Sequence, residues 1–122
     1  MHDAHELLAD LNASGRELRA HIPEVYSGYV RMSSGAMGDG ALSAAMKELI
    51  ALAIAVTREC DGCVASHARG AARKGATEQE VAEALGVAIM MNGGPGTVWG
   101  PRAFDAFREF AAPRQDTPPG QG

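Results

Sequence analysis

Hydrophobic residues recur at helical spacing along the N-terminal part of the chain. Asp3 and Glu6 have the spacing of a capping box, which favours the start of a helix. That helix would carry Leu7, Leu8 and Leu11 on its apolar side. Pro23 suits the first turn of a second helix, because its nitrogen has no hydrogen to leave unpaired there. The glycine-bearing stretch 33–41 is predicted to break this second helix, whose apolar residues are Val25, Tyr26, Tyr29 and Val30.

The middle of the chain predicts a pair of helices joined by a short loop. Ser43 is placed to cap a helix that runs to about residue 57. Since this segment is apolar on almost every side, we expect it to be central and buried. A second helix is predicted over about 60–74, and Gly75 is well placed to end it. The two together predict a helix hairpin over about 43–74.

Two further helices are predicted after the hairpin. Thr77 and Glu80 form a second capping box. The helix that they open is expected to direct toward the core Val81, Ala84, Leu85, Ala88 and Met91. The stretch 92–96 should end it, and a last amphipathic helix carries on one stripe Phe104, Phe107 and Phe110. Residues 113–122 contain no apolar residue beyond prolines, and we expect them to be disordered.

These patterns predict an all-α fold made of a single domain over residues 1–112. No segment shows the sustained alternation of apolar and polar residues that is typical of a half-buried strand. A chain of 122 residues is long enough for one hydrophobic core. With 46% hydrophobic and only 5% aromatic residues, that core must be filled mainly by Ala, Leu, Ile, Val and Met.

Charge and hydropathy argue against several classes of partner. The formal net charge of −4, without a Lys/Arg cluster, argues against nucleic acid. The longest apolar run, 49–56, is far shorter than the ~18 residues that span a bilayer, which argues against a membrane. The start of the chain lacks the basic and apolar regions of a secretory signal, so we expect a cytoplasmic location. In that compartment, two close cysteines favour redox chemistry or metal binding over a structural disulfide.

The stretch RECDGCVASHARG, 58–70, holds the only cysteines of the chain. At roughly 100° per residue, Cys60, Cys63 and His67 fall on one face of a helix. Cys60 lies at or just before the helix start, where unpaired N–H groups and the macrodipole favour an anion. A thiolate is the nucleophile in peroxide and disulfide chemistry, and a free thiol has a pKa of about 8.5. The helix terminus and a nearby imidazolium can favour the thiolate, but these residues alone do not say which cysteine is the nucleophile.

The spacing of three also predicts a reversible Cys60–Cys63 disulfide. A sulfenic acid on one sulfur condenses with a neighbouring thiol and is thereby protected from overoxidation. Simpler interpretations are open as well: both cysteines could be small buried apolar residues, His67 a surface histidine, and Glu48 a surface partner of Lys47. Against the last of these, Glu48 lies in an otherwise apolar segment, where a carboxylate without a partner is costly.

Other site chemistries fit less well, and we expect neither a metal nor an organic cofactor. Zinc prefers four ligands, and Cys60, Cys63 and His67 supply three. Covalent haem needs a histidine directly after the second cysteine, where Val64 stands. A thioredoxin fold would present its CxxC after a strand, and no strand is predicted before this one.

With Glu48 included, the pattern reads E-x11-C-x2-C-x3-H, from Glu48 through Cys60 and Cys63 to His67. It resembles the alkylhydroperoxidase D-like (AhpD-like) branch of the carboxymuconolactone decarboxylase family, and the similarity extends over residues 47–107. The resemblance implies an all-α helical bundle around a central hairpin, assembled into trimers or hexamers. It also implies a thiol-dependent peroxidase or disulfide oxidoreductase. Such an enzyme reduces a hydroperoxide and is regenerated by a dithiol reductant, either dihydrolipoamide or a thioredoxin-like protein.

Carried over to this chain, the resemblance assigns a role to each residue of the pattern. Cys63 would be the peroxidatic nucleophile, Cys60 the resolving thiol, and His67 with Glu48 the proton relay. An aspartate and a glycine stand where founding alkylhydroperoxidases carry a histidine next to the second cysteine, and the charge of Asp61 disfavours a thiolate. One alternative is a redox-sensing or structural oligomer without efficient turnover. A lactone decarboxylase fits less well, because the true decarboxylases of the family lack the CxxC pair.

The distribution of apolar residues predicts a homo-oligomer. The hairpin and the stretch 87–91 offer more apolar helix surface than a monomer of 12.7 kDa would readily cover. The surplus is expected to lie between subunits, with the active site near a subunit boundary. We favour a hexamer over a trimer.

Overall fold

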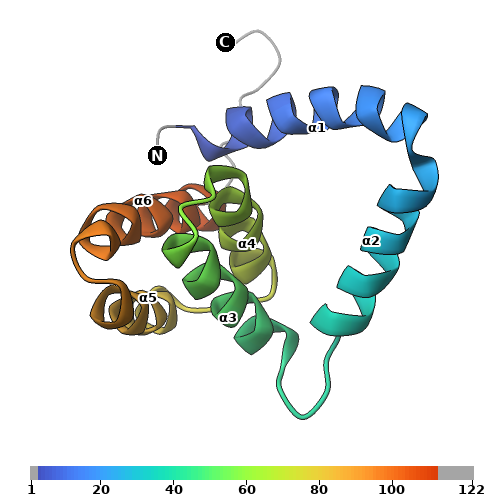
Figure 1. The fold of residues 1–122 in the computed structure, drawn as a ribbon. Helices are drawn as coiled ribbons and strands as arrows, with labels where there is room; N and C mark the ends of the chain where they lie inside the picture. Colours follow the sequence, from blue (N-terminus) through green and yellow to red (C-terminus); the bar gives the residue numbers. More distant parts are fainter. Residues whose placement is uncertain (1–2, 113–122) are drawn as a thin grey trace, which may run out of the picture.

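The computed structural model describes residues 3–112, which form six α-helices and no strand (Figure 1). The helices are α1 (Ala4–His21), α2 (Pro23–Met37), α3 (Ala44–Thr57), α4 (Asp61–Arg73), α5 (Glu78–Asn92) and α6 (Gly94–Ala111). The predicted all-α fold is therefore confirmed. The segment 113–122, predicted to be disordered, lies outside the described residues. Within the described part of the chain, no helix is both long and apolar enough to cross a lipid bilayer.

Helices α3 to α6 form the body of the fold around one core. α6 packs against both α4 and α5, and α3 packs against the same two helices. The largest fully buried side chains are Leu52, Val56, Val64 and Val81, and alanines make up much of the rest of the core. Because alanine side chains are small, the four helices approach closely, and the α3–α4 hairpin is held in a fixed register.

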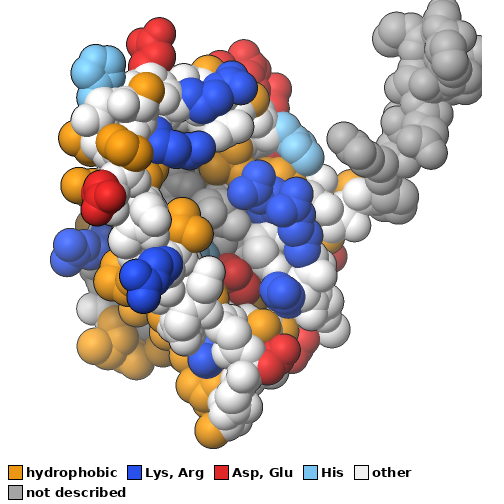
Figure 2. All heavy atoms as spheres, turned by 90° about the vertical axis from the view of Figure 1, so that its right-hand side faces the viewer, with side chains coloured by type: hydrophobic (Ala, Val, Ile, Leu, Met, Phe, Trp, Pro, Cys, Tyr) orange, Lys and Arg blue, Asp and Glu red, His pale blue; other side chains and the backbone are white. Residues whose placement is uncertain are grey.

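Helices α1 and α2 lie around the body and bury little of their own surface. In Figure 1, α1 passes across the body near α4, and α2 runs back from the far end of α1 along one side of the body. Ala4 is the one buried residue of α1 within its described span, and α2 has none. A hollow of about 660 Å³ lies between α1, α2 and α4. Figure 2 views the molecule from the α2 side, where the surface is hollowed and Lys and Arg side chains gather around the depression.

The helix ends follow the signals read from the sequence. Pro23 occupies the first turn of α2, and the Ser43 side chain caps α3. Thr77 and Glu80 form a complete capping box at α5, in which each side chain accepts a hydrogen bond from the backbone N–H of the other. Gly75 follows α4 with a φ of 83°, a left-handed conformation that glycine adopts without steric penalty.

Two expectations about burial are wrong. α3 is not buried on every side: Met46, Ile50 and Ile54 are 44%, 44% and 56% exposed. Met91, expected on the core side of α5, is 73% exposed. Each of these helices buries only the face that meets its neighbours, and the opposite face stays apolar and uncovered. In addition, α2 continues into the stretch 33–41 and ends within it.

Candidate redox site

The turn between α3 and α4 fixes the position of the cysteine pair. Arg58 is the C-cap of α3, and its backbone N–H donates to the carbonyl of Ile54 over 3.0 Å. The next residue, Glu59, has a left-handed backbone with a φ of 53°, which reverses the chain sharply. The backbone N–H of Cys60 then donates to the carbonyl of Ala55 over 3.2 Å. Cys60 is thereby held at the N-cap of α4.

Cys60 and Cys63 are joined by a disulfide at the start of α4. Their Cα atoms are 5.2 Å apart, within the usual range for a disulfide. The backbone N–H of Cys63 donates a 3.3 Å hydrogen bond to Cys60 Sγ. In a reduced protein, the same donor and the positive end of the helix dipole would favour a Cys60 thiolate. Cys63 is exposed, whereas Cys60 is half-buried, so a reactant from solvent reaches Cys63 more readily.

Glu48 and His67 form a hydrogen-bonded pair across the hairpin. Glu48 comes from α3 and His67 from α4, and Glu48 Oε2 lies 2.9 Å from His67 Nδ1. The side chains are 14% and 30% exposed, respectively, so the carboxylate is the more enclosed partner. A neutral imidazole that donates Nδ1–H to this carboxylate presents Nε2 as a proton acceptor. The geometry therefore suits a relay in which Glu48 orients the imidazole and His67 exchanges the proton.

Gly70 provides the space that the Glu48 carboxylate occupies. A Cβ built on Gly70 would collide with the carboxyl carbon and both oxygens of Glu48, Oε1 lying 2.6 Å away. The carboxylate therefore lies directly against the backbone of α4, one turn beyond His67. A side chain of any other residue type at position 70 would push it out of this place.

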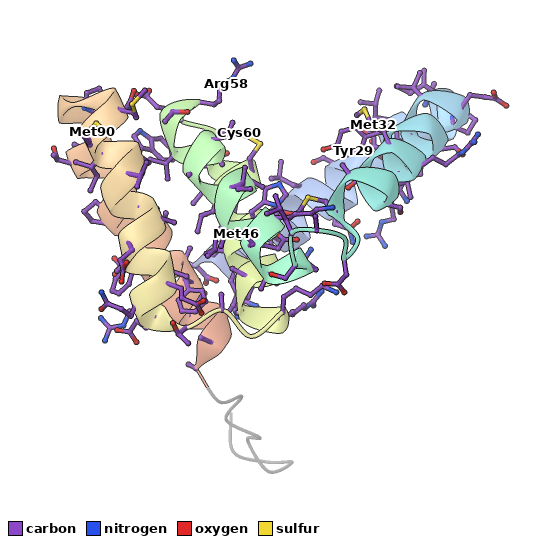
Figure 3. The ribbon with its side chains drawn as sticks, turned by 90° about the horizontal axis from the view of Figure 1, so that it is seen from below. Tyr29, Met32, Met46, Arg58, Cys60 and Met90 are labelled. Atoms are coloured by element: carbon purple, nitrogen blue, oxygen red, sulfur yellow. A yellow bond between two sulfur atoms is a disulfide. The ribbon has the colours of Figure 1, made fainter. Side chains whose placement is uncertain are left out.

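A hollow of about 470 Å³ gives access to the disulfide. It is lined by both cysteines and by His67, and the remaining lining residues are Ala51, Ile54, Ala55 and Arg58. Viewed from below in Figure 3, the Arg58 and Cys60 side chains extend from the same edge of the body, at the α3–α4 turn. Within residues 3–112, no three His, Cys, Asp or Glu side chains are grouped so that they could hold a metal ion.

The structure brings all four predicted site residues together and bears on the simpler interpretations of the sequence. Lys47 does not pair with Glu48, because Lys47 Nζ donates to the backbone carbonyl of Gly38 over 2.6 Å. His67 is only partly exposed and is paired with Glu48. The cysteines are bonded to each other at an accessible helix start and are not two buried apolar residues. The Asp61 carboxylate accepts from the backbone N–H of Gly62 over 2.6 Å.

Sequence reasoning missed two residues of the site, Gly70 and Arg58. A glycine inside a helix three positions after His67 was a usable signal, because such a glycine is unfavourable unless something needs the space. Arg58 gave no comparable signal, since its spacing to the cysteines does not tell whether its side chain points toward them.

Comparison with known proteins gives consistent matches. The sequence model of the carboxymuconolactone decarboxylase family matches residues 23–110. An uncharacterized protein of Cupriavidus necator is 38% identical over 105 residues, which are 86% of this chain and 93% of that protein. Uncharacterized protein 4 in the cox locus of Paracoccus denitrificans is 39% identical over 66 residues, 54% of this chain and 60% of that protein. The crystal structure of an apo carboxymuconolactone decarboxylase family protein from Legionella pneumophila superimposes with a TM-score of 0.88 at 34% identity, covering 92% of this chain and all of that one.

Proposed function

The chain belongs to the carboxymuconolactone decarboxylase family, and from this premise we propose that it is a thiol-dependent peroxidase or disulfide oxidoreductase of the AhpD-like branch. Family membership alone is compatible with a decarboxylase as well as with a peroxidase. The observation that carries the proposal is the Cys60–Cys63 pair, bonded at a helix start and open to a hollow that His67 also lines. Such an arrangement suits two-electron exchange between a thiol pair and a substrate.

In the proposed oxidative half-reaction, the Cys63 thiol gives its proton to His67, and the resulting thiolate attacks the distal oxygen of a hydroperoxide. The O–O bond breaks, Cys63 becomes a sulfenic acid, and the alkoxide takes a proton from His67 and leaves as an alcohol. The Cys60 thiol then gives its proton to His67 and attacks the Cys63 sulfur, which forms the disulfide. The departing hydroxide takes this proton from His67 and leaves as water. Glu48 keeps the imidazole in the tautomer and orientation that these proton transfers require.

In the proposed reductive half-reaction, a thiolate of the reductant attacks the exposed Cys63 sulfur. The Cys60 sulfur leaves as a thiolate, and the N–H of Cys63 together with the helix dipole stabilises that leaving group. A second thiol of the reductant then releases Cys63. Thus the helix start assists Cys60 as the leaving group and exposure assists Cys63 as the attacked atom, which supports the division of roles between the two cysteines.

The test is peroxide consumption by the reduced protein, with dihydrolipoamide and with thioredoxin as alternative donors. A Cys60→Ser variant should accumulate a sulfenic acid on Cys63 that reacts with dimedone, because the resolving thiol is missing. A Cys63→Ser variant should form no such adduct. If the disulfide forms and is reduced reversibly but peroxide is not consumed with any donor, a redox-sensing or structural role replaces the peroxidase.

A cytoplasmic location fits an enzyme that depends on a dithiol donor.

The apolar face of α3 and α5 supports a homo-oligomer, and we propose the hexamer over the trimer. Its exposed residues are Met46, Ile50, Ile54, Val87, Met90 and Met91. Figure 3 shows Met90 on the α5 side of the body and Met46 near the start of α3. A shallow apolar hollow of about 410 Å³ lies between these two helices, where a second copy of the chain could be accommodated. Light scattering tests the assembly, and a mass of 12.7 kDa would contradict it.

A further inference from the structure

The hollow that exposes the disulfide contains one cation that the proposed proton relay does not use. Arg58 lines it together with both cysteines, whereas the other lining residues apart from His67 are Ala51, Ile54 and Ala55. Glu59 and Asp61, the acidic neighbours in the sequence, do not line it. The charge inside this hollow is therefore positive, on an otherwise apolar wall.

Among the described residues, none engages the Arg58 guanidinium, which leaves it available to a ligand. Arg58 is exposed, and within residues 3–112 its side chain takes part in no ion pair or hydrogen bond. Its backbone is nevertheless fixed, because it caps α3 and is followed by the left-handed residue Glu59. A guanidinium presents several N–H donors in a plane, which match the two oxygens of a carboxylate.

In its disulfide form, the site must be reached by a reductant before it can react again. With the Cys60–Cys63 disulfide formed, the next molecule to enter is the reductant. We infer that Arg58 is a positioning residue that selects a small dithiol carrying a carboxylate on an apolar chain. The apolar wall would contact the chain, and Arg58 would bind the carboxylate while a thiolate reaches Cys63. This inference rests on the proposed function, in that it takes the disulfide to be reduced in each cycle.

The reaction balances without a further reactant. One thiolate of the dithiol attacks Cys63 Sγ, forms a mixed disulfide and displaces the Cys60 thiolate, which takes up a proton. The second thiol loses its proton and attacks the dithiol's own sulfur in the mixed disulfide. The dithiol closes to a cyclic disulfide, and the Cys63 thiolate leaves and takes up the second proton. Two electrons and two protons pass from the dithiol to the protein.

Dihydrolipoate and dihydrolipoamide form a matched pair of probes, because they share the dithiol and the carbon chain and differ only in charge. We would mix each with the oxidised full-length protein and follow the appearance of protein thiols by alkylation and mass spectrometry. The ratio of the two second-order rate constants cancels any general change in disulfide reactivity. In the wild type, the acid should react up to about fivefold faster than the amide, the effect of one exposed charge pair, and added salt should reduce the ratio.

Variants assign this preference to Arg58. Arg58→Met should bring the ratio close to one, and Arg58→Lys should retain most of it. Arg73→Met is the control, since it removes a cation from the exposed end of the same helix as Cys63 but outside the hollow, and it should leave the ratio unchanged.

The outcomes separate this inference from the proposed function. An equal ratio in the wild type and Arg58→Met overturns the role of Arg58, even if the protein consumes peroxide. Failure of both dithiols to reduce the disulfide also overturns it, whereas peroxide consumption with thioredoxin would then keep the peroxidase. If no donor supports peroxide consumption, but the charge preference is present and is lost in Arg58→Met, the inference stands and the peroxidase does not.

Discussion

Replacing Gly70 with alanine tests whether the Glu48–His67 pair depends on the space beside α4. The added Cβ would lie 2.6 Å from Glu48 Oε1 and closer to Oε2, whereas ordinary contacts begin at 3.4 Å. The carboxylate must therefore withdraw by nearly an ångström or rotate away. Its 2.9 Å hydrogen bond to His67 cannot be kept in the present geometry.

The expected effect on stability is modest because two contributions oppose each other. Losing a hydrogen bond to a partly enclosed carboxylate costs about 1.5–3 kcal/mol. Alanine inside a helix is more favourable than glycine by about 0.8–1 kcal/mol, which offsets part of the loss. We expect Gly70→Ala to lower the free energy of unfolding by about 1–2 kcal/mol, measured by urea denaturation of the oxidised protein. The fold should therefore survive the substitution.

The expected effect on reactivity is larger. General acid–base groups contribute about 10²–10⁴ in rate, and disturbing the proposed relay should remove a substantial part of this contribution. We expect Gly70→Ala to lower peroxide consumption about tenfold to hundredfold. The alkylation of the reduced cysteines by iodoacetamide at neutral pH should also slow, and this readout does not require turnover.

Two controls decide the interpretation. Gly86→Ala makes the same change inside α5 with no atom within 4 Å of the new Cβ, so it should be neutral or stabilising and fully reactive. In a Glu48→Ala background, which removes the colliding carboxylate, Gly70→Ala should cause no further loss of rate. A Gly70→Ala protein with wild-type reactivity, or with a loss that adds to that of Glu48→Ala, would refute this reasoning.

Three further predictions concern packing, assembly and pH. Gly96→Ala should destabilise the protein by about 1–3 kcal/mol in urea denaturation. The new alanine Cβ would lie 2.9 Å from the Cα of Ile89, a backbone atom of α5 that cannot easily move. Unchanged stability would contradict this contact. Ile50→Asp places a charge on the exposed apolar face, so it should reduce the proposed homo-oligomer to smaller species in light scattering while the helical circular dichroism is kept. An unchanged mass would exclude this face from the proposed interface. The backbone and side-chain hydrogen bonds with Thr77 hold the pKa of Glu80 below its ordinary value of 4.5. The ionised capping box should therefore stabilise the fold above pH 4.5. This contribution is lost as the pH falls through the lower pKa that Glu80 has in the folded protein. Glu80→Gln should therefore lose less stability than the wild type in denaturation series below pH 4.5, and identical losses would argue against the linkage.

The sequence by itself determined the secondary structure and the local part of the site. Caps such as Ser43 and the Thr77–Glu80 box act within one helical turn, so their signals survive in any tertiary context. The Cys60–Cys63 spacing likewise places both sulfurs at one helix start without reference to the rest of the chain. The part played by Glu48, in contrast, came from the resemblance to a family and from the cost of leaving a carboxylate unpaired in an apolar segment.

Only the tertiary structure decided how the helices meet. Which face of α3 is buried depends on the rotation of this helix against α4 and α5. Helical periodicity does not fix that rotation when a segment is apolar all round, so the sequence could not predict that Ile50 and Ile54 are exposed. The contact of Glu48 with His67, and the space that Gly70 leaves for it, depend on how closely two helix backbones approach. The same holds for Arg58, whose side chain lines the disulfide hollow because the α3–α4 turn is tied back by hydrogen bonds to Ile54 and Ala55. Such distances result from packing of the whole core, which no local sequence pattern specifies.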